Sequence, residues 1–196
     1  MTEALAVSNV ILWIVVFALV VAVFALARQI GVLYERVAPM GALMIDNGPK
    51  VGAPSPVFTL TDLGGRPVNV GTPSPSSTLL FFLSPTCPVC KKLLPILKSA
   101  TATERRWLSI VLASDGDEAE QREFIRRARL EAFPYVLSTA LGVTYQVSKL
   151  PYAVLLDERG VVRAKGLVNS REQLESLFTA KDLGVASIQE FVDQKA

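Results

Sequence analysis

The chain has 196 residues, a formal net charge of +2 at pH 7 and a mean hydropathy of +0.39. Its 20 Lys and Arg residues are scattered among 18 Asp and Glu residues, a distribution that gives no basic surface for nucleic acid. No histidine and only two cysteines are present, so mechanisms with a histidine base are excluded. A closed zinc site needs about four Cys or His ligands, and here it would require ligands from a second chain. We predict no metal site.

The first predicted element is a membrane-spanning helix over residues 4–27. These 24 residues carry no charge and are mainly Val, Leu, Ile, Ala and Phe. At about 1.5 Å per residue such a helix spans roughly 36 Å, enough to cross a bilayer. A cleavable signal peptide is the alternative, since Ala25-Leu26-Ala27 resembles a cleavage site. The run is longer than the apolar region of a usual signal peptide, and no Lys or Arg precedes it, which favours a retained helix.

Residues 28–50 are interpreted as a juxtamembrane segment and linker, because Pro39 and Gly48 fall within a mixed sequence. Arg28 and Arg36 follow the apolar segment, whereas no Lys or Arg precedes it. By the positive-inside rule alone, this bias places the rest of the chain in the cytoplasm.

Residues 51–196 are predicted to form one domain in which strands and helices alternate. Two short strands joined by a Gly-rich turn are expected within 57–60 and 64–70. The continuous apolar run at 78–83 indicates a strand buried on both faces, followed by a helix from Cys87 or Pro88. The remaining elements expected are strands at 110–113, 135–137, 152–156 and 161–164, and helices at 115–129, at 139–147 and from Ser170 onward.

Both cysteines lie in the sequence Cys87-Pro88-Val89-Cys90, after the buried strand and at the start of the helix. The N-terminus of a helix presents unpaired N–H groups and a partial positive charge, which stabilise a thiolate. The thiolate is the attacking species in disulfide exchange, so Cys87 is the predicted nucleophile. Cys90 lies one helical turn later on the same face, where it can resolve a mixed disulfide. We therefore predict a redox-active Cys87–Cys90 disulfide and no other cofactor. The alternative is a pair of inert core cysteines.

Three segments at the start of the domain, Val51-Gly52-Ala53-Pro54, Phe58-Thr59-Leu60 and Gly65-Arg66-Pro67-Val68, resemble an entry hairpin of the thioredoxin superfamily. The matching branch contains membrane-tethered bacterial thioredoxins and peroxiredoxins. The resemblance implies an α/β thioredoxin fold, with a central mixed sheet flanked by helices and an N-terminal hairpin extension.

Within the helix, Pro95 matches the proline that kinks the active-site helix of thioredoxins. Leu150-Pro151 matches the position of the superfamily's cis-proline. The resemblance implies that Pro151 packs beside the cysteines and, with Leu150, binds an extended substrate. Residues expected to support the two cysteines are Thr86, Pro88, Val89 and Pro95.

A closer resemblance is carried by residues 28–33, 35–39, 84–92, 112–118 and 165–169. These segments resemble the MauD family of methylamine utilisation proteins. The resemblance implies a single-pass protein of the bacterial inner membrane that acts in maturation, disulfide formation or transport of the methylamine dehydrogenase light (beta) subunit. That client belongs to a periplasmic enzyme dense in disulfides. A periplasmic domain is therefore preferred over the cytoplasmic one that the charge bias indicates.

Some positions depart from the wider superfamily. Thr86 stands where many thioredoxins have Trp, and Phe81 stands where they have a buried acid, so a proton relay through such an acid is not expected. Leu80 and Ser84 stand where peroxiredoxins have Pro and Thr, which disfavours peroxidase activity. The leading hypothesis is a thiol-disulfide oxidoreductase. A non-catalytic client-binding module and a thiol peroxidase are the alternatives, and the direction of exchange and the redox partner stay open.

Overall fold

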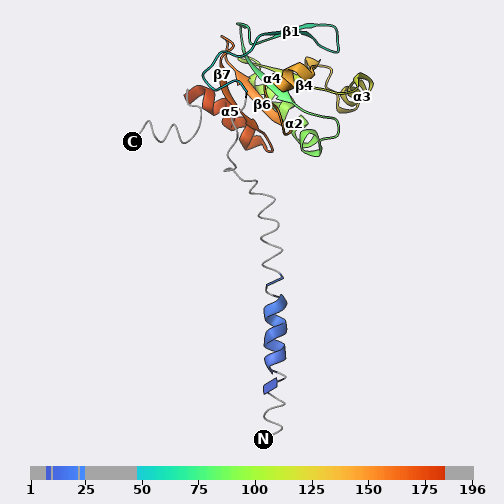
Figure 1. Ribbon diagram of the computed structural model, residues 1–196, viewed down its shortest axis with the longest axis vertical. Helices are drawn as coiled ribbons and strands as arrows, with labels where there is room; N and C mark the ends of the chain where they lie inside the picture. The colour runs from blue at the N-terminus through green and yellow to red at the C-terminus, as the bar shows by residue number, and fades with distance from the viewer. Residues whose placement is uncertain (1–7, 10, 22, 25–47, 184–196) are drawn as a thin grey trace. The chain divides into compact units, whose positions relative to one another are not determined.

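The computed structural model describes residues 8–9, 11–21, 23–24 and 48–183 (Figure 1). The chain divides into two compact units, Met1–Ile45 and Asp46–Ala196. The expected linker lies outside the described residues as far as residue 47, and so do residues 184–196 of the expected domain.

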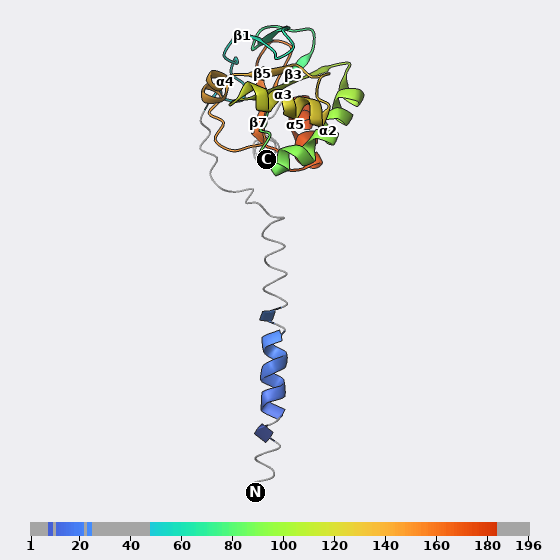
Figure 2. The same ribbon diagram turned by 90° about the vertical axis from the view of Figure 1, so that its right-hand side faces the viewer.

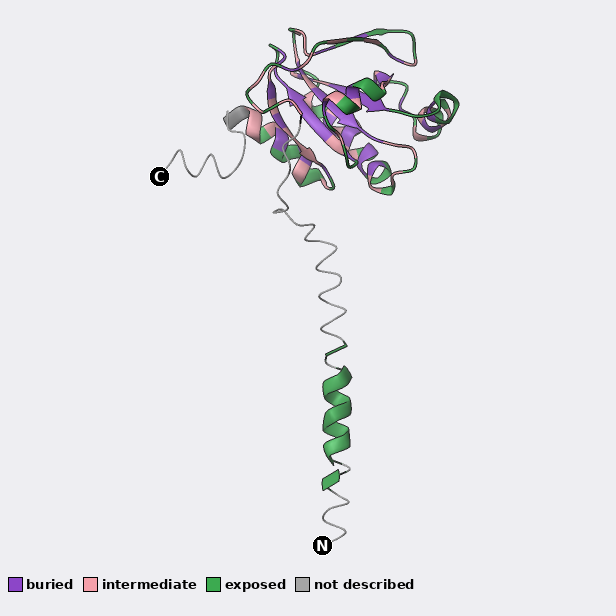
Figure 3. Cartoon of the chain, in the orientation of Figure 1, coloured by how far each residue is buried: buried purple, intermediate pink, exposed green. Residues whose placement is uncertain are grey.

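Of the expected membrane-spanning segment, residues 8–9, 11–21 and 23–24 are helical and their apolar side chains are exposed (Figure 3). Residues 4–7, 10, 22 and 25–27 lie outside the described residues. Among the residues that are described, no helix combines the length and the apolar character needed to cross a membrane. The membrane-spanning helix stays a prediction.

The second unit begins with the predicted hairpin. Strands β1 (Phe58–Thr61) and β2 (Pro67–Val70) pair antiparallel, which confirms the two strands and the turn between them. The buried carboxylate of Asp62 holds the turn, because it accepts hydrogen bonds from the backbone N–H groups of Gly64 and Arg66 at 2.9 and 2.7 Å. Burial acts to raise the pKa of Asp62, but the hydrogen bonds from Arg66 and Gly64 outweigh it and hold the pKa below its usual value.

A five-stranded mixed sheet forms the centre of the domain, in the order β5-β4-β3-β6-β7. β3 pairs parallel with β4 and antiparallel with β6, and β4 pairs parallel with β5. β6 and β7 form the predicted antiparallel hairpin. The strand bounds are β3 Ser77–Phe82, β4 Leu108–Ser114, β5 Tyr135–Leu137, β6 Tyr152–Leu156 and β7 Val162–Leu167.

Helices cover both faces of this sheet (Figures 1 and 2). Their bounds are α2 Pro88–Glu104, α3 Glu118–Ala128, α4 Thr139–Thr144 and α5 Arg171–Leu183. Successive side chains of β3 alternate between two core clusters, as the pleat of a strand requires. Leu79 and Phe81 pack with residues of α2, α3 and α5, while Leu80 and Phe82 pack with residues of α4 and the β1–β2 hairpin. The domain is therefore a three-layer α/β structure, as predicted.

The β6–β7 turn lies at the end of the sheet where β3 begins. Asp157 is 5% exposed, and its carboxylate accepts hydrogen bonds from the backbone N–H groups of Arg159 and Val161, both at 2.9 Å. The guanidinium of Arg163 donates to the other carboxylate oxygen. Burial acts to raise the pKa of Asp157, but these hydrogen bonds outweigh it and lower the pKa. Gly160 adopts a φ of +77°, and a Cβ there would collide with the backbone of Gly71.

Several element boundaries differ from the sequence prediction by a few residues; β7, for example, spans Val162–Leu167 rather than 161–164. Two of the shifts have a clear cause in the backbone. β4 begins at Leu108 rather than Ile110, because its pairing with β3 starts at Ser77. The helix expected at 139–147 ends at Thr144, because Gln146 turns into the left-handed region with a φ of 51°. The N–H of Val147 then bonds to the carbonyl of Gly142, which closes the helix end.

Candidate active site

The turn between β3 and α2 positions the first cysteine. The backbone N–H of Cys87 bonds to the Ser84 carbonyl at 3.1 Å, and the Ser84 and Thr86 hydroxyls are 2.9 Å apart. Pro88 occupies the first turn of α2, where its missing N–H costs nothing. Cys87 is the N-cap, and its Sγ accepts a hydrogen bond from the Cys90 N–H at 3.1 Å. The first cysteine therefore sits where free N–H groups of the helix can stabilise a thiolate.

Cys87 and Cys90 are joined in a disulfide, with their Cα atoms 5.3 Å apart. Cys87 is partly exposed, whereas Cys90 is 0% exposed. An approaching thiol can therefore attack the Cys87 sulfur, while the Cys90 sulfur is screened from solvent.

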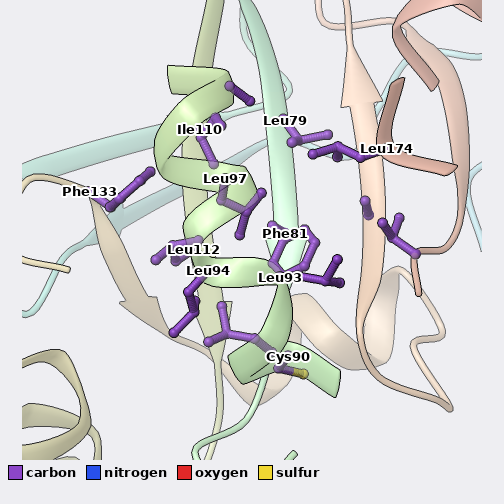
Figure 4. Packing of buried hydrophobic residues seen from close by; sticks show 14 of the residues in the cluster. Leu79, Phe81, Cys90, Leu93, Leu94, Leu97, Ile110, Leu112, Phe133 and Leu174 are labelled. Atoms are coloured by element: carbon purple, nitrogen blue, oxygen red, sulfur yellow. The ribbon is translucent and has the colours of Figure 1, made fainter. Parts of the chain in front are cut away.

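The surroundings of Cys90 are apolar (Figure 4). Cys90 lies at the first turn of α2, and Leu93, Leu94 and Leu97 follow it toward the sheet. Phe81, which occupies the superfamily's acid position, is 0% exposed in the same cluster.

The Leu150–Pro151 peptide bond is cis, as the resemblance implied. Tyr152, the next residue, pairs with Phe82 of β3, so Pro151 lies at the end of the sheet from which the chain continues to Cys87. The Pro151 carbonyl accepts a hydrogen bond from the Val168 N–H at 3.1 Å. Leu150 is 37% exposed, and within residues 48–183 neither its N–H nor its carbonyl has a hydrogen-bond partner. An extended peptide could pair with this backbone.

The other supporting residues contribute in different ways. Val89 is partly buried and packs against the core cluster that contains Cys90. Pro95 lies inside α2 and is exposed, so its missing N–H is on the solvent side. Thr86 is exposed and contacts Ser84. The structure brings Cys87, Cys90 and Pro151 to one end of the sheet, while Pro95 lies further along the helix.

A pocket of about 330 Å³ lies at the same end, between α4, the ends of β3 and β4, and the loop that leads to Pro151. We call it the α4-side pocket, and its lining includes Leu83, Asp115, Gly142, Lys149 and Leu150. The sequence analysis did not predict it, because these residues come from separate parts of the chain. Asp115 is not the N-cap of α3, since Asp117 fills that role by accepting a hydrogen bond from the Glu120 N–H at 2.9 Å.

A buried polar chain holds the loop beside this pocket. The Tyr135 hydroxyl donates to Gln121 at 2.6 Å, and the Gln121 amide donates to the Asp115 carbonyl at 2.8 Å. Burial raises the pKa of Tyr135 to about 12, and a hydrogen bond with Ser114 acts in the opposite direction. Tyr135 therefore stays a protonated donor, and the chain of bonds fixes the backbone of Asp115.

Several known proteins share the fold of this domain. A sequence profile of a thioredoxin-like family matches residues 75–162. The thioredoxin domain of a thiol-disulfide oxidoreductase from Bacteroides vulgatus is 24% identical and covers 65% of this chain and 96% of its own, with a TM-score of 0.55. StoA from Bacillus subtilis is also 24% identical, covering 65% of this chain and 98% of its own, with a TM-score of 0.56. These likenesses establish the thioredoxin fold.

Relatives of higher identity define the family. A methylamine utilization protein MauD from Methylobacillus flagellatus is 50% identical over 187 residues, which are 94% of this chain and 90% of that protein. MauD from Paracoccus denitrificans is 45% identical over 194 residues, covering 98% of this chain and 96% of that protein. The chain belongs to the MauD family of methylamine utilisation proteins, which confirms the resemblance found in the sequence.

Proposed function

We propose that this protein is a thiol-disulfide oxidoreductase in which Cys87 exchanges disulfides with a client and Cys90 resolves the mixed disulfide. The observation that carries the proposal is the contrast between the two sulfurs at one helix N-terminus. Cys87 is partly exposed and accepts a backbone hydrogen bond, whereas Cys90 is 0% exposed behind it. This asymmetry directs the client to a single sulfur.

The exchange needs only the two cysteines. A client thiolate attacks the Cys87 sulfur, the Cys87–Cys90 bond breaks, and Cys90 leaves with the electron pair and takes up a proton. A second client thiolate then attacks the client sulfur of the mixed disulfide, a client disulfide forms, and Cys87 leaves as the thiolate, so the client is oxidised and the pair is reduced. The reverse sequence reduces a client disulfide. A separate redox partner must reset the pair, and the reduction potential of the pair decides which direction prevails.

The proposed client is the light (beta) subunit of methylamine dehydrogenase. Membership of a family named for methylamine utilisation supports a role in that metabolism. Leu150 and Pro151 would bind an extended segment of this subunit, since Leu150 is 37% exposed at the same end of the sheet as the disulfide and its N–H and carbonyl have no partner within residues 48–183.

The proposed location is the periplasmic side of the bacterial inner membrane, with residues 4–27 as a single anchor. The support is the uncharged apolar run and the helical conformation of its described residues. Resistance to alkaline extraction tests the anchor. A reporter fused after Ala196 tests the side, because activity confined to a cytoplasm-specific reporter would overturn the periplasmic placement.

The deciding experiment replaces both cysteines by serine in a host whose own copy of the gene is deleted. We expect the light subunit to lack native disulfides and methylamine dehydrogenase activity to be lost. A Lys91→Ala/Lys92→Ala variant is the matched control, because it changes two exposed neighbours and leaves the sulfurs in place. Full maturation with the double serine variant would reject the enzyme and favour a client-binding module. Peroxide turnover by the purified protein would instead establish a thiol peroxidase.

A further inference from the structure

The α4-side pocket shares two residues with the candidate active site. Leu83 lies between β3 and the turn that carries Cys87, and Leu150 directly precedes Pro151. A peptide that pairs with the Leu150 backbone while bonded to Cys87 therefore passes the mouth of this pocket. Its side chains point alternately to either side, so one of them can enter.

The interior of the pocket is mainly apolar. Phe82, Leu83, Ala113, Val147 and Leu150 contribute to its lining. The volume of about 330 Å³ is far larger than the roughly 10–15 Å³ of cavity that one water needs. An apolar lining of this size suits a large apolar side chain, with aromatic rings giving the greatest buried area.

The rim of the pocket carries two side chains of opposite charge that do not pair with each other. Asp115 and Lys149 both line the pocket and are exposed. Within residues 48–183, neither charged group has a hydrogen-bond or ion-pair partner. A carboxylate accepts from a peptide N–H and an ammonium donates to a peptide carbonyl. The rim therefore complements the backbone of an extended peptide.

The pocket is also held open by its surroundings. The bonds from Tyr135 through Gln121 to the Asp115 carbonyl fix one wall. On the other wall, Ser138 caps α4 by accepting a hydrogen bond from the Leu141 N–H at 3.1 Å. A preformed pocket loses less conformational freedom when a ligand binds.

We propose that the α4-side pocket is a selectivity site that takes a large apolar side chain, aromatic by preference, from the client segment next to the exchanging cysteine. Asp115 and Lys149 bind the peptide backbone on either side of that residue. The inference rests on the proposed function, because it names what the same site selects in its client.

Two measurements with synthetic peptides test this assignment, one of binding affinity and one of disulfide exchange. In one series a central cysteine is replaced by serine, and a single Phe or Ala stands at each neighbouring position in turn. The dissociation constants of these peptides for the oxidised full chain in detergent measure selection without redox chemistry. The same series with cysteine measures exchange. At one position we expect Phe to bind roughly tenfold more tightly than Ala, the gain from burying an aromatic side chain.

Gly142→Leu is the variant that fills the pocket. A Cβ at Gly142 meets no heavy atom within 4 Å, and the residue lies in α4 without a positive φ, so the fold accepts the change. The control is Val143→Leu, which changes a 68% exposed neighbour on the same helix. We expect Gly142→Leu to reduce the preference for Phe to about one, because the added side chain fills the space that the Phe ring would occupy. The control should keep the preference.

The outcomes separate the two proposals. Equal binding of Phe and Ala peptides at every position, or an unchanged preference in Gly142→Leu, would overturn the pocket assignment even where exchange proceeds. Selective binding of serine peptides without any exchange of cysteine peptides would support the pocket and reject the oxidoreductase.

Discussion

At the end of the sheet that carries the β6–β7 turn, Asp157 and Glu158 pair with basic side chains, whereas Asp115 and Lys149 at the disulfide end have no ion-pair partner within residues 48–183. Asp157 binds Arg163, and Glu158 accepts hydrogen bonds from Ser77 and Lys181, both at 2.8 Å. At the disulfide end, Asp115 is exposed and unpaired within residues 48–183. The cysteines there are held by backbone hydrogen bonds and apolar packing.

The difference follows from what each end has to do. Paired charges around a turn fix the chain and leave little for a ligand to bind. An exchange site needs a reachable sulfur, an open backbone and polar groups that a client can still engage. The predictions below change one end at a time, so that stability and chemistry can be separated.

The largest effect is expected on the rate of disulfide exchange, when either cysteine is replaced. Cys90→Ser should lower exchange by several orders of magnitude and accumulate a mixed disulfide between Cys87 and the client, because the resolving sulfur is gone. Non-reducing gels after acid quenching would detect it. Cys87→Ser is the matched variant, and it should trap nothing, since Cys90 is 0% exposed. Equal trapping by both variants would contradict the assigned roles.

The second largest effect is expected on the free energy of unfolding, from a substitution in the β6–β7 turn at the end of the sheet opposite the disulfide. Asp157→Asn should lower the free energy of unfolding by roughly 2 kcal/mol, because the amide keeps an oxygen for the two backbone N–H groups but loses the charge and turns an NH2 group toward the Arg163 guanidinium. Urea unfolding followed by circular dichroism measures it. The control is Asp115→Asn at the disulfide end, which should change the free energy by less than about 0.5 kcal/mol. Similar losses for both would remove the contrast between the ends.

Acid should lower the free energy of unfolding by protonating the buried carboxylates of Asp62 and Asp157. The pKa values of Asp62 and Asp157 are lowered in the folded chain, so their contribution to stability is complete above the unfolded value near 4. It is lost as the pH falls through the folded pKa. The free energy of unfolding should therefore drop below about pH 4. The drop should be smaller in Asp157→Asn, and an equal drop would assign the acid sensitivity to other groups.

The smallest effect is expected at Glu158. Hydrogen bonds from Lys181, from its own backbone N–H and from Ser77 lower the pKa of Glu158 to about 2. Its side chain is 45% exposed, so solvent screens the pair with Lys181. Glu158→Gln should cost less than about 1 kcal/mol, and the cost should shrink further in high salt. A loss as large as that of Asp157→Asn would show that exposure does not weaken this pair.

Much of the fold was predictable because each element had a local signal. The apolar run before Cys87 gave β3, and the Gly-rich segment between two short patterns gave the β1–β2 hairpin. Ser170 and Gln173 predicted the start of α5, although Gln173 bonds to the Asn169 N–H rather than to that of Ser170. Capping geometry depends on backbone angles that a spacing pattern does not specify.

Features formed by distant segments were not predictable in this way. Asp62 and Asp157 were merely turn residues in the sequence, and their burial depends on how the hairpins pack. The α4-side pocket likewise arises only when the ends of β3 and β4 meet α4 and the loop before Pro151. The hydrophobic periodicity of a sequence does not indicate which distant segments come into contact. The position of the cysteine pair at a helix N-terminus could be predicted, because the strand, the turn and the helix around it are neighbours in the sequence.

Trp107 gives the domain an intrinsic optical signal. Its ring packs edge-on against Phe178 with centroids 5.5 Å apart, and the Lys181 ammonium lies 4.6 Å from its centre. The sequence contains one other tryptophan, Trp13. In a Trp13→Phe protein, all tryptophan emission would come from the contact between β4 and α5, at the end of the sheet away from the disulfide. Such emission would report the detachment of the last helix and stay unchanged when the cysteines are reduced.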